Sequence, residues 1–579
     1  MRINLRLLFC AVLSVLGSIV TIAFFYPLSR FPWFGIIVAA GIFFCFYYLG
    51  LLQSRREEFS NKAKLFIGIA SFILSALLMF SLKGPQNFLL GHSALLNIVI
   101  YGGTFFAMGM LIAASLFVLA SIKWTITPRE VPKRFFWIYF ILIFSCGLVY
   151  LIAFYPAGMS PDSLASWRQA HTFEFNDWHP IFFTWTIMVL VQIWDSPAIM
   201  TLFQNLVLSS FLAYSFYQLQ KLGIRPVLLF LMCLIIMVIP TFGVYTIIIW
   251  KDVLFSATIL IFTVHLFLIV HSNGEWLKYR LNFILFFLSS FGVVFYRHNG
   301  FPIFIVTMIV LILLYRKQLW KKAGLIFAVL FLAHQFVTGP VFNWLDVKPS
   351  DPNEALAIPT QQIANIIVND GNLTEEQLAY YDEILPIEVW KEKYQPHTVD
   401  PIKFTWDQYR RDVIFADFPK YLKTWGQVVV QNPGLATEGF LKHTALVWQI
   451  STPPYGYTNT YFTFIMENEF GETNKVISEP VTEKVTAYLE KSKSASFVKK
   501  LWRPALYAAI ILYFSILLLA RNGYKSTVII LPFLLNVASI MAAMPAQEFR
   551  YLFANVLLTF VIPFMALVKP KKGGEVENA

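Results

Sequence analysis

Long apolar runs separated by short polar breaks fill most of the chain, and this pattern predicts membrane-spanning helices. A helix that crosses a bilayer needs about 17–25 largely apolar residues, and the sequence contains about 14 runs that approach or reach this length. They lie near residues 5–26, 33–52, 64–82, 97–121, 135–155, 198–219, 227–248, 253–271, 281–296, 300–315, 322–339, 502–520, 526–544 and 549–568. We therefore expect an all-α polytopic membrane protein with about 14 transmembrane helices.

The apolar run 181–194 is shorter and can be counted either as a span or as a helix that lies in the membrane interface. Lys and Arg in short loops favour the cytoplasmic side, and a non-spanning 181–194 places the basic clusters of these loops on one side. The clusters are Arg55, Arg56, Lys62 and Lys64; Lys123, Arg129, Lys133 and Arg134; Lys221 and Arg225; Lys278 and Arg280; Arg316, Lys317, Lys321 and Lys322; Arg521 and Lys525; and Lys569, Lys571 and Lys572. We therefore predict that both termini are cytoplasmic. A membrane hairpin of 181–194 and 198–219 is the alternative.

This topology places the other polar breaks together. The loop 156–196, the breaks 250–252, 296–299 and 547–551, and the segment 340–501 all fall on the extracytoplasmic side. Polar residues from distant parts of the chain are therefore expected to share one face of the cell membrane.

Residues 340–501 form a sizeable segment without a membrane-length apolar run. Thr374 and Gln377 have the spacing of a capping box that opens a helix. Residues 418–430 have the pattern of an amphipathic helix, which Asn432 and Pro433 would end. At about 160 residues the segment can form a small domain, and we expect a mostly helical extracytoplasmic domain inserted before the last three spans.

The composition agrees with a membrane protein. The chain is 58% hydrophobic and 13% charged, whereas soluble domains carry about 25% charged residues. The net charge of +12 does not indicate nucleic-acid binding, because residues 340–500 are near −6 and the basic excess lies largely in the short loops. All four cysteines lie inside apolar runs, so the sequence indicates neither a disulfide framework nor a thiolate metal site.

The loop 156–196 carries two candidate carboxylates in a chain where charge is costly and usually has a function. Asp162 follows Ser160 and Pro161 at an expected helix start. It can cap that helix, as Asp and Ser often do, or it can accept a proton from a substrate hydroxyl as a general base. The two roles are compatible.

The second part of the loop contains Asp177 and His179, directly before Pro180. A Pro at the first helical position is common, so this stretch can be a plain helix entry. Alternatively, His179 binds a metal or a phosphate, and Asp177 orients it.

Three later polar breaks carry charge on the predicted outer face, where basic residues are disfavoured. Their residues are Lys251, Asp252, Arg297, His298, Glu548 and Arg550. Salt pairs at a membrane boundary and snorkelling side chains can explain them. An anionic phosphate is the other explanation, since Arg and Lys bind phosphate oxygens. The sequence has no GxGxxG, Walker, HExxH or GxSxG motif.

These motifs resemble the GT-C glycosyltransferases. A span is followed by a loop with an early acid, then by Trp-His-Pro-Ile-Phe-Phe at 178–183 and an apolar run ended by Trp-Asp-Ser at 194–196. The pattern is similar to the protein mannosyltransferase and aminoarabinose transferase branch, where His-Pro-Pro-Leu or Lys-Pro-Pro-Leu opens the segment; here Ile181 replaces the second Pro. The breaks at 251–252, 297–300 and 548–551 resemble a bacterial subgroup of multi-pass envelope proteins.

The resemblance covers about 135–340 and 502–568. It implies transfer of a sugar from a polyprenyl-phosphate donor to an extracytoplasmic glycan, teichoic acid, lipid or protein. Asp162 matches the loop acid that lies near the acceptor, and Asp252 and Asp177 are further candidates for a catalytic role. Substrate and phosphate binding would fall to His179, Lys251, Arg297, His298, Glu548 and Arg550. Such enzymes differ in metal use, so a divalent cation stays open.

The expected organisation has five parts. These are a four-span extension (1–134), a GT-C-like core (135–339), the extracytoplasmic domain (340–501), three spans (502–568) and a cytoplasmic basic tail (569–579). Two other functions use a similar lipid. A lipid-linked sugar flippase or transporter would carry ionisable residues near the middle of several spans, whereas here they concentrate at one face. A polysaccharide polymerase or ligase would share the donor, and the sequence does not separate it from single-sugar transfer.

Overall fold

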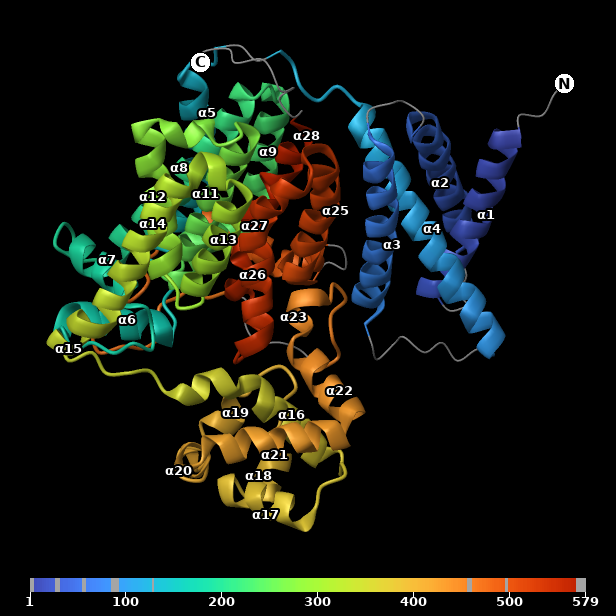
Figure 1. Cartoon of the computed structure of the whole chain (residues 1–579). Helices are drawn as coiled ribbons and strands as arrows, with labels where there is room; N and C mark the ends of the chain where they lie inside the picture. Colours follow the sequence, from blue (N-terminus) through green and yellow to red (C-terminus); the bar gives the residue numbers. More distant parts are fainter. Residues whose placement is uncertain are drawn as a thin grey trace.

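The computed structural model describes residues 5–26, 32–54, 59–84, 93–127, 130–455, 461–494 and 498–568. In these ranges the chain is helical, and it forms isolated β-bridges but no β-strand. Figure 1 shows a main bundle of helices, a separate group of helices from the N-terminal part of the chain beside it, and a small helical body at one end. The predicted basic tail 569–579 and the predicted cytoplasmic residues Arg55, Arg56 and Arg129 lie outside the described ranges.

Eleven helical segments of the described ranges are long and apolar enough to cross a membrane. Ten of them are built on α1 (Leu5–Phe25), α2 (Trp33–Ser54), α3 (Asn61–Lys83), α4 (Ala94–Ser121), α5 (Arg134–Ala153), α8 (Pro197–Lys221), α11 (Lys251–His271), α14 (Arg316–Phe336), α25 (Pro504–Asn522) and α26 (Thr527–Ala543). The last combines η8 (Phe549–Leu552), α27 (Phe553–Thr559) and α28 (Ile562–Leu567). The chain is therefore a multi-pass, all-α membrane protein.

A twelfth span is counted if α9 (Pro226–Val238) and α10 (Pro240–Ile247) are one broken helix, bent by 67°. Pro240 lies at the break, and proline removes a helical hydrogen bond there. The sequence pattern predicted one uninterrupted run across this position.

Two further predicted spans form shorter helices, α12 (Arg280–Phe295, 16 residues) and α13 (Gly300–Leu314, 15 residues). At 1.5 Å per residue they are about 24 and 22 Å long, less than the roughly 30 Å of a hydrocarbon core. The count of 14 spans therefore stays a prediction. Helix α7 (Ile181–Val191) has 11 residues and packs on α6 (Pro161–Thr172); a length of about 16 Å is too short to cross a bilayer.

Helix α11 is the centre of the main bundle. It is buried from Asp252 to Ile269 and contacts α8, α12, α26 and α27. A largely apolar helix can face lipid or be buried in protein, and the contacts of α11 show that it is buried in protein. Its first residues, Lys251 and Asp252, are therefore fixed by packing along the whole helix.

The helices α1–α4 pack on one another and reach the main bundle mainly through α3 and α25 (Figure 1). The hydroxyl groups of Ser115 and Tyr513 are 2.6 Å apart at this contact. Phe80 stacks on Trp448, with 4.7 Å between ring centroids.

The polar segment contains η5 (Pro352–Leu356), α16 (Ala357–Val368), α17 (Glu375–Ile384), α18 (Ile387–Lys393), α19 (Asp400–Lys403), α20 (Arg411–Ala416), α21 (Phe418–Gln431), α22 (Pro433–His443), α23 (Ala445–Trp448) and α24 (Glu479–Ser494). Its own core includes Ile363, Tyr381, Trp390 and Tyr421. Helix α24 packs instead against α5 of the main bundle.

Two local predictions for this segment are confirmed. The hydroxyl of Thr374 accepts from the Gln377 N–H (3.2 Å), and the Gln377 side chain accepts from the Thr374 N–H (2.9 Å), so the capping box opens α17. The predicted amphipathic helix is α21, and Pro433 begins the next helix. Helices α16–α22 lie at the end of the bundle where α6 and α15 (Phe342–Trp344) also lie (Figure 1).

Candidate active-site cavity

Backbone pairing between three distant stretches positions the candidate site. Gly158 donates to Ile247 O (3.0 Å) and accepts from the Ile249 N–H (3.1 Å). Met159 pairs on its other side with Phe464 and Met466 (3.0 and 3.1 Å). The stretch 158–159 leads directly into α6, and 247–249 leads into α11. These bonds therefore fix the starts of both helices relative to each other.

Gly158 is required for this close approach, because a Cβ at this position would lie 2.1 Å from the carbonyl oxygen of Phe462. We predict that Gly158→Ala destabilises the protein by about 1–3 kcal/mol, as overpacking usually does. Thermal unfolding in detergent measures the effect. Gly324→Ala is the control, since nothing lies within 4 Å of its Cβ; equal melting temperatures for the two variants would contradict the role of Gly158.

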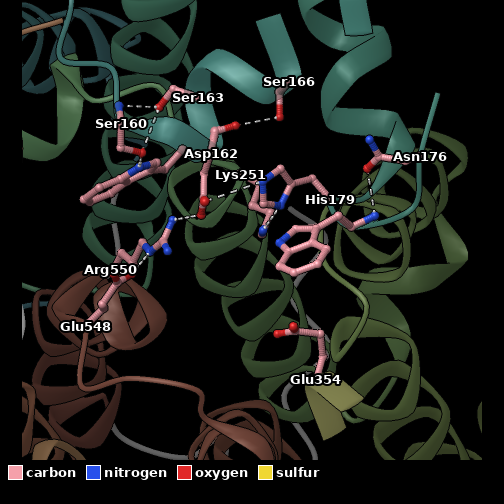
Figure 2. Close-up of polar contacts among 12 residues, drawn as sticks. Ser160, Asp162, Ser163, Ser166, Asn176, His179, Lys251, Glu354, Glu548 and Arg550 are labelled. Carbon is pink, nitrogen blue, oxygen red and sulfur yellow. Dashed lines mark hydrogen bonds and ion pairs between the residues drawn. The ribbon is translucent and has the colours of Figure 1, made fainter. Parts of the chain in front are cut away.

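Asp162 lies in the first turn of α6, but it is not the capping residue. Ser160 occupies the N-cap position, and its backbone N–H donates to Ser163 Oγ (3.1 Å). The carboxylate of Asp162 instead accepts a hydrogen bond from Arg550, and its Oδ1 lies 3.7 Å from His179 Nε2 (Figure 2). The sequence left a capping role and a chemical role open for Asp162, and its side chain is directed at the charged groups.

His179 is held between Lys251 and Asp162 (Figure 2). An ammonium group can only donate, so Nδ1 of His179 accepts from Lys251 and the ring proton resides on Nε2, which faces Asp162. Burial, together with the Lys251 charge, lowers the pKa of His179 to about 3. The imidazole is therefore neutral at physiological pH, and its Nε2–H is a donor next to Asp162.

Arg550 joins two carboxylates, because its Nε donates to Glu548 and its Nη1 donates to Asp162. Its guanidinium also lies 4.9 Å from the ring centroid of Trp250. The indole Nε1–H of Trp250 in turn donates to Ser160 Oγ (2.7 Å). The last membrane segment is thus connected to the start of α6.

The two carboxylates next to Arg550 have opposite pKa shifts. Burial by itself raises the pKa of Asp162, but the positive charges of Arg550 and Lys251 outweigh it and hold the pKa well below its usual range. Burial also raises the pKa of Glu548, and there the Arg550 charge does not fully compensate. Asp162 is therefore ionised at any physiological pH.

Asp252 and Arg297 form a second ion pair. Asp252 is fully buried, and its Oδ1 lies 3.0 Å from Arg297 Nη1. Arg297 also donates to Tyr551 O (3.3 Å), and its guanidinium lies 4.9 Å from the Tyr551 ring centroid. Asp252 thus holds Arg297 in place.

These groups meet at a cavity of about 590 Å³. The membrane side of its wall includes Asp162, His179, Lys251, Arg297, His298, Glu548 and Arg550. The polar segment forms the opposite side with Ser350, Glu354, Asp400, Lys403 and Phe404. Seven of the nine predicted site residues therefore line a single cavity, although they come from four separate stretches of the chain.

The other two predicted residues do not line it. Asp252 is fully buried and pairs with Arg297, which does line the cavity. Asp177 was expected to orient His179, but its Oδ1 lies 3.0 Å from His298 Nε2 instead. Because the loop turns between residues 176 and 179, neighbours in sequence point to different partners.

Glu354, Asp400 and Lys403 were missed by the sequence analysis. They lie in a segment that is rich in polar and charged residues, so a single charged residue there does not indicate a functional site. In the described part of the chain, no group of three or more His, Cys, Asp or Glu side chains is arranged to hold a metal ion.

The helical bundle and the charged cavity identify the chain as a multi-pass membrane protein with a candidate binding or catalytic site. The particular family follows from a family model that matches residues 137–578, and the chain belongs to this family of unknown function (DUF6020). The match begins after α1–α4 and includes every residue of the cavity. No curated protein and no solved structure matches the chain.

Proposed function

We propose that the protein is a membrane glycosyltransferase that moves a sugar from a polyprenyl-phosphate donor to an extracytoplasmic acceptor. The observation that carries this proposal is an ionised carboxylate, Asp162, in one cavity with Lys251, Arg297 and Arg550. Such a site combines a proton acceptor with cations suited to a leaving phosphate. The resemblance of the loop motifs to GT-C enzymes supports the same reaction.

The reaction would proceed as a single displacement. The acceptor hydroxyl oxygen forms a bond to the anomeric carbon, its proton goes to Asp162, and the bond from that carbon to the phosphate oxygen breaks. The polyprenyl phosphate leaves with the electron pair. Arg550, Lys251 and Arg297 stabilise the charge that develops on this phosphate.

Arg550 would also control the basicity of Asp162. In the free protein its positive charge keeps the carboxylate a weak base. A bound phosphate would compete with Asp162 for Arg550, and a weaker pairing raises the pKa of Asp162. The donor would thereby activate the base that its own reaction needs.

The orientation is part of the proposal, with both termini cytoplasmic and residues 340–501 extracytoplasmic. Glu375 and Gln318 are both exposed, and they lie on opposite sides in this topology. Glu375→Cys should react with a membrane-impermeant maleimide on intact cells, whereas Gln318→Cys should react only after lysis. Labelling is compared with the parent, which contains four native cysteines. The reverse pattern would contradict the orientation.

The activity is tested with purified protein in proteoliposomes, polyprenyl-phosphate sugars labelled in the sugar, and envelope material from a strain that lacks the gene. The proposal predicts labelled acceptor and free polyprenyl phosphate in equal amounts. Movement of the intact donor across the bilayer, with no bond cleavage, would support a transporter instead.

A further inference from the structure

The cavity has two chemically different walls. On the membrane side, Arg550, Lys251 and Arg297 supply positive charge. On the side of the polar segment, Glu354 and Asp400 supply two carboxylates. Figure 2 shows the Glu354 carboxylate pointing from a separate element toward the space beside His179 and Lys251. This second wall is not needed to bind a phosphate.

Lys403 organises the second wall. Its side chain is 4% exposed, and its Nζ lies 2.9 Å from Glu354 Oε1 and 3.4 Å from Asp400 Oδ1. The ammonium also lies 4.5 Å from the ring centroid of Phe404 and 5.5 Å from that of Trp178. Trp178 comes from the loop before α7, so both sides of the cavity meet at Lys403.

The carboxylates keep free capacity for a ligand. The side chains of Glu354 and Asp400 are 29% and 40% exposed, and both line the cavity. A carboxylate offers about four lone-pair positions, and one ammonium does not fill those of two carboxylates. Trp178 is partly exposed at the same cavity and offers an aromatic ring.

We propose that this wall, consisting of Trp178, Glu354, Asp400, Lys403 and Phe404, binds the sugar of the donor and selects an uncharged hexose. The inference rests on the proposed function and names the substrate class of the same site. Hydroxyl groups donate to the carboxylates, and the apolar face of the sugar ring lies on Trp178. Acidic sugars are disfavoured, because two carboxylates and one lysine leave a net negative charge.

This assignment gives the two walls of the cavity different roles. The cations hold the phosphate, and the acidic wall holds the sugar ring, so the bond between them lies near Asp162. The residues that the polar segment places in the cavity then determine which sugar is bound. A phosphate alone would not contact this wall.

The test measures binding to the full-length protein in nanodiscs. The probes are polyprenyl phosphate alone and its conjugates with glucose, galactose, mannose, N-acetylglucosamine and glucuronic acid. We expect at least one uncharged conjugate to bind more tightly than free polyprenyl phosphate, and the glucuronic acid conjugate to bind more weakly than that conjugate. Glu354→Gln should weaken the preferred conjugate about tenfold, as loss of a charge-assisted hydrogen bond does, and leave polyprenyl phosphate unchanged.

Asp370→Asn is the matched control, since Asp370 forms an ion pair with Lys391 in the same segment but is 84% exposed. Trp178→Leu is the second variant, because it removes the ring without breaking the Lys403 ion pairs, and it should also weaken only the conjugate. If no uncharged conjugate binds more tightly than polyprenyl phosphate, or if Glu354→Gln and Trp178→Leu match Asp370→Asn, the sugar wall is disproved. If the parent binds neither polyprenyl phosphate nor any conjugate, the proposed function fails with it.

Discussion

Asp162→Asn should reduce sugar transfer by about 10²–10⁴-fold, the usual effect of losing a positioned general base, while the protein still inserts and folds. Ser160, not Asp162, is the N-cap of α6, so the helix keeps its cap. Arg550 keeps Glu548 as a partner. Asn also retains an oxygen that can accept from Arg550, but it cannot take a proton. Initial rates of transfer with purified protein measure the change.

Asp195→Asn is the matched control for this prediction. Asp195 pairs with His171 at 2.9 Å near the start of α8, but it is largely exposed and lies away from the cavity lining. Its rate should stay within about twofold of the parent, as expected for an exposed pair. Near-parent turnover of Asp162→Asn, together with a loss of activity in Asp252→Asn or Asp177→Asn, would assign the base to another carboxylate.

Arg550→Gln should reduce the transfer rate by about 10²–10³-fold, because preorganised groups that stabilise developing charge contribute on this scale. The variant should also bind polyprenyl phosphate more weakly. Arg550→Lys should restore only part of the rate, since an ammonium cannot reproduce the two directed bonds of a guanidinium to Asp162 and Glu548.

The pH profile separates this role from a purely structural one. Arg550 lowers the pKa of Asp162 against burial, which raises it. Removing Arg550 therefore raises this pKa, and the acid limb of the residual activity should move to higher pH. Arg168→Gln is the control, because Arg168 forms an exposed pair with Glu469. A profile that is scaled down but not shifted would contradict the electrostatic link between Arg550 and Asp162.

The sequence predicted the membrane side of the cavity because charge is rare in apolar segments. Lys251, Arg297 and Arg550 each interrupt long apolar runs, and such interruptions require a physical reason. The same contrast predicted the helices, since a long apolar run has few other stable structures in lipid. Pro240 is a helix-breaking residue that can be read from the sequence, but the size of the bend, 67°, depends on how α9 and α10 pack.

The other wall of the cavity could not be predicted in this way. Glu354 and Lys403 lie in a segment rich in charge, where single charged residues carry little information. Their proximity depends on the path of the chain between η5 and α19, which no local pattern specifies. The same reason explains why Asp177 contacts His298, 121 residues away in sequence, and not the neighbouring His179.

The most direct test of the glycosyltransferase assignment is the amount of polyprenyl-phosphate sugars in a strain that lacks the gene. Mass spectrometry should find one such lipid accumulating in this strain, together with loss of the matching sugar from the envelope. The parent gene should reverse both changes, and the Asp162→Asn gene, expressed at the same level, should reverse neither. Unchanged lipid-linked sugars in the deletion strain, or full complementation by Asp162→Asn, would contradict the assignment.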